Sequence, residues 1–192
     1  MFVVVGLGNT GGRYEKTRHN AGWILLDALL GDVIWSHDGM ANAHIYIDAV
    51  AGHEVMYVKP LTMMNRSGET IAYLMKQYNV TPDCMMVLHD ELDLSVGQVK
   101  ISHNRGHGGN NGVRSIHQHI GGKHVARMRI GISHLTDEEI PRRIKTNVLG
   151  DFNAQDMQKI KGLAQITAHA IKIWIERGVE HAMNQINEKS SL

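Results

Sequence analysis

A histidine early in the chain and a carboxylate in its middle are the residues best suited to chemistry. His19 lies in a polar stretch between two apolar segments, and Asp90 follows the apolar run 84–88. A histidine that takes a proton from water needs a carboxylate at its other ring nitrogen, because the carboxylate fixes the tautomer and stabilises the imidazolium. For His19 alone, a hydrogen bond to the backbone at a helix start is the more common role. The pairing with Asp90 therefore depends on the fold.

A covalent nucleophile is not indicated. The chain has no Gly-x-Ser-x-Gly motif, and its one cysteine, Cys84, belongs to an apolar run. Nucleophilic serines and cysteines need an exposed position beside a base. The pattern therefore favours direct attack by water.

A glycine pattern near the N-terminus suggests a different chemistry. Gly6-x-Gly8-x-x-Gly11 follows the apolar run 2–5 and matches the fingerprint of dinucleotide-binding enzymes. That fingerprint requires a helix to begin within the glycines, yet the polar residues 13–19 intervene without an apolar stripe. No acidic residue follows a second strand at the proper distance. A nicotinamide or flavin enzyme is the weaker alternative.

The histidines and carboxylates raise the question of a metal site. His-Glu-x-x-His and Cys-x-x-Cys motifs are both absent. We therefore expect no metal and no cofactor. The residues considered as ligands are His103, His107, His117, His119, Asp90, Glu91 and Asp93.

Charge is unevenly distributed along the chain. The net charge is only +1, but residues 98–145 hold nine basic residues against three acidic ones, or +6, which leaves −5 for the remainder. Each Lys or Arg near a phosphate releases condensed counterions, so a basic half suits a nucleic-acid partner. A merely solvated basic face explains the count equally well.

The alternation of apolar runs and amphipathic segments predicts an α/β fold: a single three-layer domain over residues 1–192, with a twisted, mixed and mostly parallel sheet flanked by helices. Asn20, Asn65 or Ser67, and Asn153 are expected to cap helices, and Gly31 and Gly178 to end them. His19, Asp90 and Asn111 are expected in loops at the carboxyl ends of strands. The last few residues are expected to be disordered. Strands are predicted at 2–5, 43–50, 54–58, 84–88, 99–102 and 126–132, and helices at 21–30, about 65–78, 113–120 and about 154–178.

The expected cellular compartment follows from sequence features that are absent. The N-terminal residues have neither the basic start nor the long apolar core of a secretory signal, and no later apolar run is long enough to span a bilayer. One cysteine allows no internal disulfide. We expect a cytoplasmic protein that does not associate with membranes.

Several blocks of residues occur together in a fixed order over residues 1–152. This combination closely resembles the bacterial peptidyl-tRNA hydrolases. The blocks are Gly6-Leu7-Gly8-Asn9, Tyr14-Glu15, Thr17-Arg18-His19-Asn20-Ala21-Gly22, Lys59-Pro60-Leu61-Thr62-Met63-Met64-Asn65-Arg66-Ser67-Gly68, His89-Asp90-Glu91-Leu92-Asp93, Gly106-His107-Gly108-Gly109-x-Asn111-Gly112 and Arg127-x-Arg129-Ile130-Gly131-Ile132.

The resemblance implies hydrolysis of the ester bond between a peptide and the 3′ end of its tRNA, by a monomer whose partner is peptidyl-tRNA. It implies that His19 is the general base, that Asp90 orients it, and that Asn9 and Asn111 assist the reaction. The implied contacts to the peptide are Tyr14, Met64, Asn65, Asp93 and Asn111, and those to tRNA are Lys100, Arg105 and Arg129. Each of these residues also has a plain structural explanation as a turn, cap, core or solvated residue.

The sequence departs from the family pattern at four places. Thr10 replaces a proline, Asn110 a histidine, Ser102 a lysine, and Asp151 a lysine or arginine. The change at 110 casts doubt on a role for an imidazole there, and the last two changes alter the expected tRNA surface. A catalytically idle RNA-binding relative is a further alternative, which the retained polar residues argue against.

Overall fold

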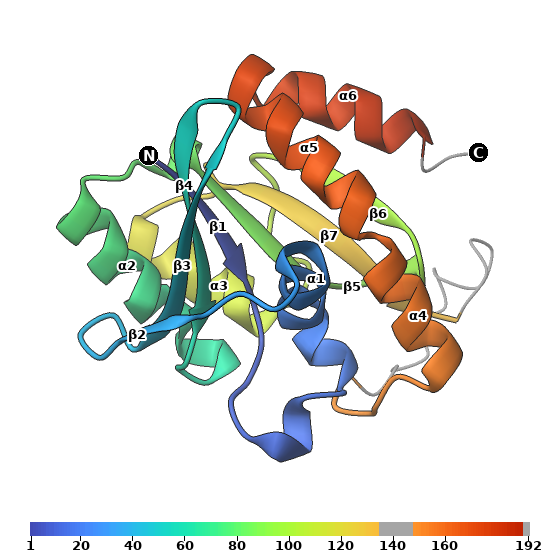
Figure 1. The fold of residues 1–192 in the computed structure, drawn as a ribbon. Coiled ribbons are helices and arrows are strands. Elements are labelled where there is room, and N and C mark those ends of the chain that lie inside the picture. Colours follow the sequence, from blue (N-terminus) through green and yellow to red (C-terminus); the bar gives the residue numbers. More distant parts are fainter. Residues whose placement is uncertain (135–147, 190–192) are drawn as a thin grey trace.

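The computed structural model describes residues 1–134 and 148–189, and a seven-stranded mixed sheet lies at its centre (Figure 1). The strand order is β2-β3-β4-β1-β5-β7-β6. Neighbours among β4, β1, β5 and β7 are parallel, whereas β2, β3 and β6 join antiparallel at the two edges. The strands are β1 (Phe2–Gly6), β2 (Ser36–Asp38), β3 (Ala43–Val50), β4 (His53–Pro60), β5 (Met85–Ser95), β6 (Val99–Ser102) and β7 (Ala126–Ser133).

Helices cover both faces of the sheet, which gives the three predicted layers (Figure 1). Helices α2 and α3 lie on one face, and α1, α4, α5 and α6 lie on the other. The helices are α1 (Ala21–Leu30), α2 (Ser67–Tyr78), α3 (Asn111–Ile120), α4 (Ala154–Gly162), α5 (Ala164–Arg177) and α6 (Val179–Lys189). In the described residues, no helix combines the length and apolarity needed to cross a membrane.

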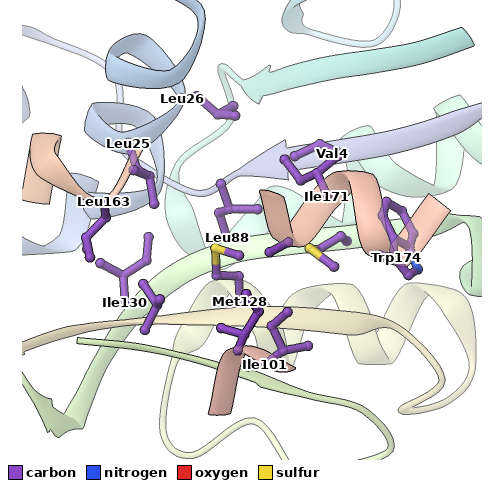
Figure 2. Packing of buried hydrophobic residues seen from close by; sticks show 14 of the residues in the cluster. Val4, Leu25, Leu26, Leu88, Ile101, Met128, Ile130, Leu163, Ile171 and Trp174 are labelled. Atoms are coloured by element: carbon purple, nitrogen blue, oxygen red, sulfur yellow. The ribbon is translucent and has the colours of Figure 1, made fainter. Parts of the chain in front are cut away.

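Two apolar cores result, because alternate residues of the central strands face opposite sides. Val4 and Leu88 point toward the layer of α1 and α5, where Leu25 and Trp174 meet them (Figure 2). Val3, Val5 and Val87 face the layer of α2 and α3. The predicted α/β class is confirmed, and so is the mixed, mostly parallel sheet.

Strand β5 is longer than the predicted run 84–88. It continues to Ser95 because β7 pairs with it through Glu91 and Gly131, with a register shift between Glu91 and Ser95. Asp90 therefore lies inside a strand, not in a loop. Asn111 likewise begins α3, and His19 belongs to the short 3₁₀ helix Arg18–Asn20. The loop positions predicted for all three residues are wrong.

The predicted helix from 154 to about 178 is divided in two. Gly162 is the last residue of α4, and a single residue, Leu163, which stays in the right-handed helical region (φ −74°, ψ −6°), separates it from α5. Glycine is a poor helix former, which weakens the helix at this point. Helix α6 follows Gly178 without having been predicted. The expected disorder of the last few residues concerns 190–192, and the basic residues at 142–145 fall within 135–147; both segments lie outside the described residues.

The predicted helix caps have mixed outcomes. Asn153 caps α4 by accepting from Asp156 N at 2.8 Å, and Gly31 and Gly178 end their helices with positive φ. Asn20 stands at the start of α1, but its side chain makes no capping hydrogen bond. Arg66, not Asn65 or Ser67, precedes α2, and no side chain caps that helix. Not every polar residue at a helix start therefore caps the helix, because some of these side chains make tertiary contacts instead.

Candidate active site

Close packing of α1 brings its first residues to the ends of β1 and β5. A Cβ atom at Gly22 would lie 2.4 Å from Leu88 O and 2.5 Å from Leu7 N, so only glycine permits this approach. His19 lies one turn before Gly22, and Asp90 lies two residues beyond Leu88. Helix and strand thereby hold the two side chains against each other.

His19 and Asp90 form a buried pair. His19 Nδ1 lies 2.9 Å from both Oδ1 and Oδ2 of Asp90, and only 9% and 5% of the two residues is exposed. A carboxylate can only accept hydrogen bonds, so Nδ1 carries the donated proton and Nε2 of a neutral imidazole becomes the acceptor. The contact expected between these two residues is therefore present, in the arrangement that leaves Nε2 able to take a proton.

The surroundings also set the charge behaviour of His19. Burial lowers the pKa of the imidazole, whereas the hydrogen bond to Asp90 and the negative charge of that carboxylate raise it. The contributions of Asp90 outweigh burial, so the pKa of His19 lies above its ordinary value of 6.5. An imidazole with this property holds a proton well once it has received one.

Asn20, next to His19, fastens the loop that follows β1. Its Oδ1 accepts from Asn9 N at 2.9 Å, and its Nδ2 donates to Asn9 O at 3.0 Å. The side chain of Asn9 in turn accepts from Met64 N at 2.8 Å through Oδ1. No hydrogen bond among residues 1–134 and 148–189 uses Asn9 Nδ2. The loop is thus fixed with one amide donor of Asn9 to spare.

The start of α3 lies beside the same loop. A Cβ atom at Gly112 would meet Met64 Sδ at 2.5 Å and Leu7 Cδ1 at 2.8 Å, so glycine allows α3 to approach. Asn110 donates from Nδ2 to Asp90 Oδ1 at 2.7 Å. Asn111 is exposed between these two contacts, and Asn65 is exposed directly after buried Met64. Hydrogen bonds and close packing therefore link the His19–Asp90 pair, through Asn20 and Asn110, to Asn9, Met64 and the neighbours of Asn65 and Asn111.

Two expected substrate residues lie apart from this ring of contacts. Tyr14 is half-buried in the 3₁₀ helix Gly12–Tyr14, and the guanidinium of Arg13 lies 4.6 Å from its ring centre. Asp93 is exposed on β5 and donates from its backbone N to Glu91 Oε1 at 3.2 Å. Neither side chain has a contact with His19 or Asp90 among those of the described ranges.

The three residues expected to contact tRNA line one groove of about 460 Å³. Arg129 donates from Nε to Glu91 Oε2 at 2.8 Å, which leaves its outer nitrogens for a ligand. Ser102, where the family pattern has lysine, is buried at the edge of this groove, and its hydroxyl has no hydrogen-bond partner in the part of the chain that the structure describes. Helix α6 supplies the facing wall. The lining residues are Lys100, Ile101, Ser102, Arg105, Arg129, Met183, Asn184, Asn187 and Glu188.

A second buried histidine lies beneath the glycine-rich segment 103–110. His89 Nδ1 donates to Asp90 O at 2.8 Å, and Arg127 Nη1 lies 3.4 Å from His89 Nε2. Complete burial, together with the charge of Arg127, lowers the pKa of His89 to about 4. Arg127 Nη2 also donates to the carbonyls of Arg105 (3.2 Å) and Gly106 (2.9 Å). Arg127 therefore ties this segment to β5.

The glycines that resemble a dinucleotide fingerprint have a packing role. A Cβ atom at Gly6 would lie 2.7 Å from Gly22 O, and one at Gly8 would lie 2.7 Å from the ring of Trp23. Both glycines thus face α1, whereas the fingerprint needs them to face a pyrophosphate. Within the described residues, no three His, Cys, Asp or Glu side chains are grouped to hold a metal ion.

Sequence reasoning missed two residues of this arrangement. The sequence predicts Asn20 as a helix cap and shows Asn110 only as a departure from the family pattern, whereas both side chains hold other site residues in place. Their position directly beside His19 and Asn111 was the available signal. The partner of each amide depends on tertiary structure and could not be predicted.

Comparison with known proteins gives consistent results over nearly the whole chain. The model of the family described as peptidyl-tRNA hydrolase matches residues 3–192. A peptidyl-tRNA hydrolase of Staphylococcus haemolyticus is 38% identical over 189 residues, covering 97% of this chain and 98% of that protein. One of Acinetobacter baumannii is 35% identical over 187 residues, covering 96% and 95%. A crystal structure of the Acinetobacter baumannii enzyme superposes with a TM-score of 0.83 at 34% identity, covering 97% of this chain and 94% of that one.

Proposed function

The chain belongs to the peptidyl-tRNA hydrolase family, a hydrolase family acting on the ester bond of peptidyl-tRNA, and on this premise we propose which residues perform the reaction. His19 is the general base and Asp90 holds it in place. The observation that carries this assignment is the pair of 2.9 Å contacts from His19 Nδ1 to the Asp90 carboxylate. Nε2 is then the only imidazole atom able to accept a proton.

In the proposed reaction, His19 Nε2 takes a proton from water as the water oxygen attacks the ester carbonyl carbon. Asp90 stabilises the imidazolium that forms. The bond between that carbon and the ribose oxygen then breaks, and the imidazolium returns its proton to the ribose oxygen. The products are a peptide with a free carboxyl group and tRNA with a free hydroxyl group, so no other reactant is needed.

Asparagine amides are suited to position the peptide and the developing oxyanion. The hydrogen bond from Met64 N to Asn9 Oδ1 fixes the direction of the amide, and in the described ranges Asn9 Nδ2 has no acceptor. Asn65 and Asn111 are exposed nearby, and an amide offers both a donor and an acceptor to a peptide of any sequence. We assign Asn9 and Asn111 to the carbonyl, and Asn65 and Met64 to the peptide.

The basic groove suits the tRNA part of the substrate. Lys100, Arg105 and Arg129 approach it from two strands and a loop, and Arg129 is held by Glu91. Phosphate groups attract such clusters through charge and through forked guanidinium hydrogen bonds. Tyr14 and Asp93, which lie outside the ring of contacts, are proposed to touch only the outer part of the substrate.

Replacing His19 by alanine tests the assignment. We expect kcat to fall by about 10²–10⁴-fold, the usual contribution of a general base, with tRNA binding and folding little changed. His169→Ala is the matched control, because His169 is exposed on α5. Release of free tRNA from N-blocked aminoacyl-tRNA gives the rates. A His19→Ala enzyme with wild-type turnover would refute the proposal.

We also expect hydrolysis to proceed without a metal. The Asp90 oxygens are engaged by His19 and Asn110, and those of Glu91 by Arg129 and the backbone of Asp93. These carboxylates therefore have hydrogen-bond partners instead of the open geometry of metal ligands. The same assay in the presence of a chelator tests this: unchanged rates support it, and a loss restored by added metal would give these carboxylates a ligand role.

We further propose that the chain works in the cytoplasm as a monomer of one domain. The tRNA substrate and the single cysteine support that compartment. Sedimentation at micromolar concentration tests the oligomeric state, because a monomer has a mass of 21.4 kDa.

A further inference from the structure

Asn110 connects the catalytic pair to helix α3 through both ends of its amide. Its Oδ1 accepts from Gly112 N (3.0 Å) and Val113 N (3.1 Å), which caps the helix. Its Nδ2 donates to Asp90 Oδ1 at 2.7 Å. Reversing the amide would set its NH₂ group against two backbone N–H donors, so the cap fixes the direction in which Nδ2 points.

We infer that Asn110 is a positioning residue of the reaction: it holds the Asp90 carboxylate, and through it His19, in the productive orientation. This inference rests on the proposed roles of His19 and Asp90. Asp90 Oδ1 receives both His19 Nδ1 and Asn110 Nδ2, so Asn110 restrains the same carboxylate oxygen that contacts the imidazole. A carboxylate with one partner turns more freely about its terminal torsion.

The same residue sets the distance between the pair and Asn111. Asn111 is the first residue of α3 and follows Asn110 directly, so the hydrogen bond to Asp90 also fixes where this helix begins. The amide has one charge state across the working pH range, which makes the link independent of pH. Of the ionisable groups in the described ranges, Asp90 is the one whose charge acts on His19.

Asn110→Ser separates the two functions of the amide. Serine caps helices about as well as asparagine, but its side chain is too short to span from the cap to Asp90. If Asn110 positions Asp90, the contact between Asp90 and His19 loosens in the variant. We then expect kcat to fall by about tenfold, as for loss of a hydrogen bond to a charged group, with KM changed less than twofold.

The pKa of His19 supplies a readout that a merely structural role would not move. A looser contact with Asp90 removes the interactions that raise this pKa, so it should fall toward 6.5. NMR titration of the imidazole in the free enzyme measures this shift without any turnover. An upward shift would mean that Asn110 withdraws charge from Asp90 rather than positioning it, and that result overturns the inference, as does an unchanged pKa.

Two comparisons make the test specific. Asn153→Ser is the matched control, because Asn153 also caps a helix, α4, through its side-chain oxygen and makes no hydrogen bond to Asp90 within the described residues; the activity of this variant should equal that of the wild type. In an Asp90→Asn background, Asn110→Ser should cause no further loss of kcat, because the residue acts through Asp90. Additive losses would overturn the inference. An active His19→Ala enzyme would refute the proposed function instead, while the NMR result on Asn110 would still stand.

Discussion

His19 and His89 both bond to Asp90, one to its carboxylate and the other to its backbone carbonyl. Both are buried, and burial alone lowers the pKa of either imidazole. For His19 the carboxylate outweighs burial and the pKa is raised, whereas His89 lies beside Arg127 and its pKa falls to about 4. Asp90 therefore lies between two groups of opposite character. One is the proton-accepting pair His19–Asp90, and the other is a neutral anchor made of His89 and Arg127.

A general base requires a free ring nitrogen, which burial alone does not provide. His89 has both ring nitrogens engaged, Nδ1 by the Asp90 carbonyl and Nε2 by Arg127, so it has no atom left for substrate. Among the described residues, His19 has a side-chain partner only at Nδ1. The anchor region instead holds the segment that includes Arg105, because Arg127 also binds two of its carbonyls. In the proposed mechanism, proton transfer and attachment of segment 103–110 thus belong to separate imidazoles.

Of the substitutions that test the contrast between His19 and His89, Asp90→Asn should have the largest effect. Without the negative charge, the imidazolium loses its stabilising partner and the tautomer of His19 is no longer fixed, so kcat should fall by about 10²–10⁴-fold. Asp32→Asn is the control, because Asp32 is exposed in the loop after α1. Single-turnover hydrolysis of peptidyl-tRNA measures the loss. A decrease below threefold would show that the carboxylate does not support catalysis.

The activity of the wild-type enzyme should follow the titration of His19. A base must be unprotonated to accept a proton, and the raised pKa of His19 places its titration above pH 6.5. We therefore expect kcat/KM to fall about tenfold per pH unit below that pKa. Initial rates between pH 5 and 8 at low substrate concentration give the profile. An acid limb whose midpoint lies below pH 6.5 would contradict the assignment to His19.

Much of this arrangement could be predicted from the sequence, because buried strands and amphipathic helices are written in local apolar patterns. The runs at 2–5 and 126–132 became β1 and β7 nearly as predicted. Strand β2 has no apolar run, since it only pairs with β3 at an edge. The polar end of β5 is a strand only because β7 pairs with it, and pairing is a property of the fold.

For the site, residue types and the family resemblance predict that His19 pairs with Asp90, but they do not predict every hydrogen bond that holds this pair and its neighbours in place. The contact of His19 with Asp90 could be expected, because an imidazole base needs a carboxylate. The link from Asn110 to Asp90 could not, because it depends on where α3 begins relative to β5. The same holds for Asn20, which binds the backbone of Asn9 instead of capping α1.

The two histidines should change the free energy of unfolding with pH in opposite directions. A raised pKa makes His19 stabilising below pH 6.5, a contribution lost as pH rises through its folded pKa. The lowered pKa of His89 does the reverse: its contribution is present above pH 6.5 and is lost as pH falls toward 4. As the pH falls from 7 to 5, the titration of His89 should lower the free energy of unfolding by about 2 kcal/mol.

His89→Asn isolates this effect, because the amide of asparagine can still donate to the Asp90 carbonyl but does not titrate. Urea unfolding at pH 7 and pH 5 should show a smaller loss for the variant than for the wild type. Other histidines contribute equally to both proteins and cancel. The acid limb of the activity profile should not move. Identical pH dependence of unfolding in the two proteins would show that His89 is not held neutral.

The smallest effect is expected from Arg105→Ala. This variant removes the Arg105 side chain from the basic groove and leaves the backbone carbonyl that Arg127 holds. Arg127 holds the carbonyl of Arg105, which alanine retains, while the exposed guanidinium is lost. Catalysis at saturating substrate should be unchanged, KM should rise a few-fold, and the slope of log KM against log salt should decrease by about one. Lys76→Ala on α2 is the control, because Lys76 is exposed in the opposite helix layer from α6. If the variant keeps the wild-type salt slope, Arg105 makes no phosphate contact, and the anchor serves only to hold the backbone beside Asn110.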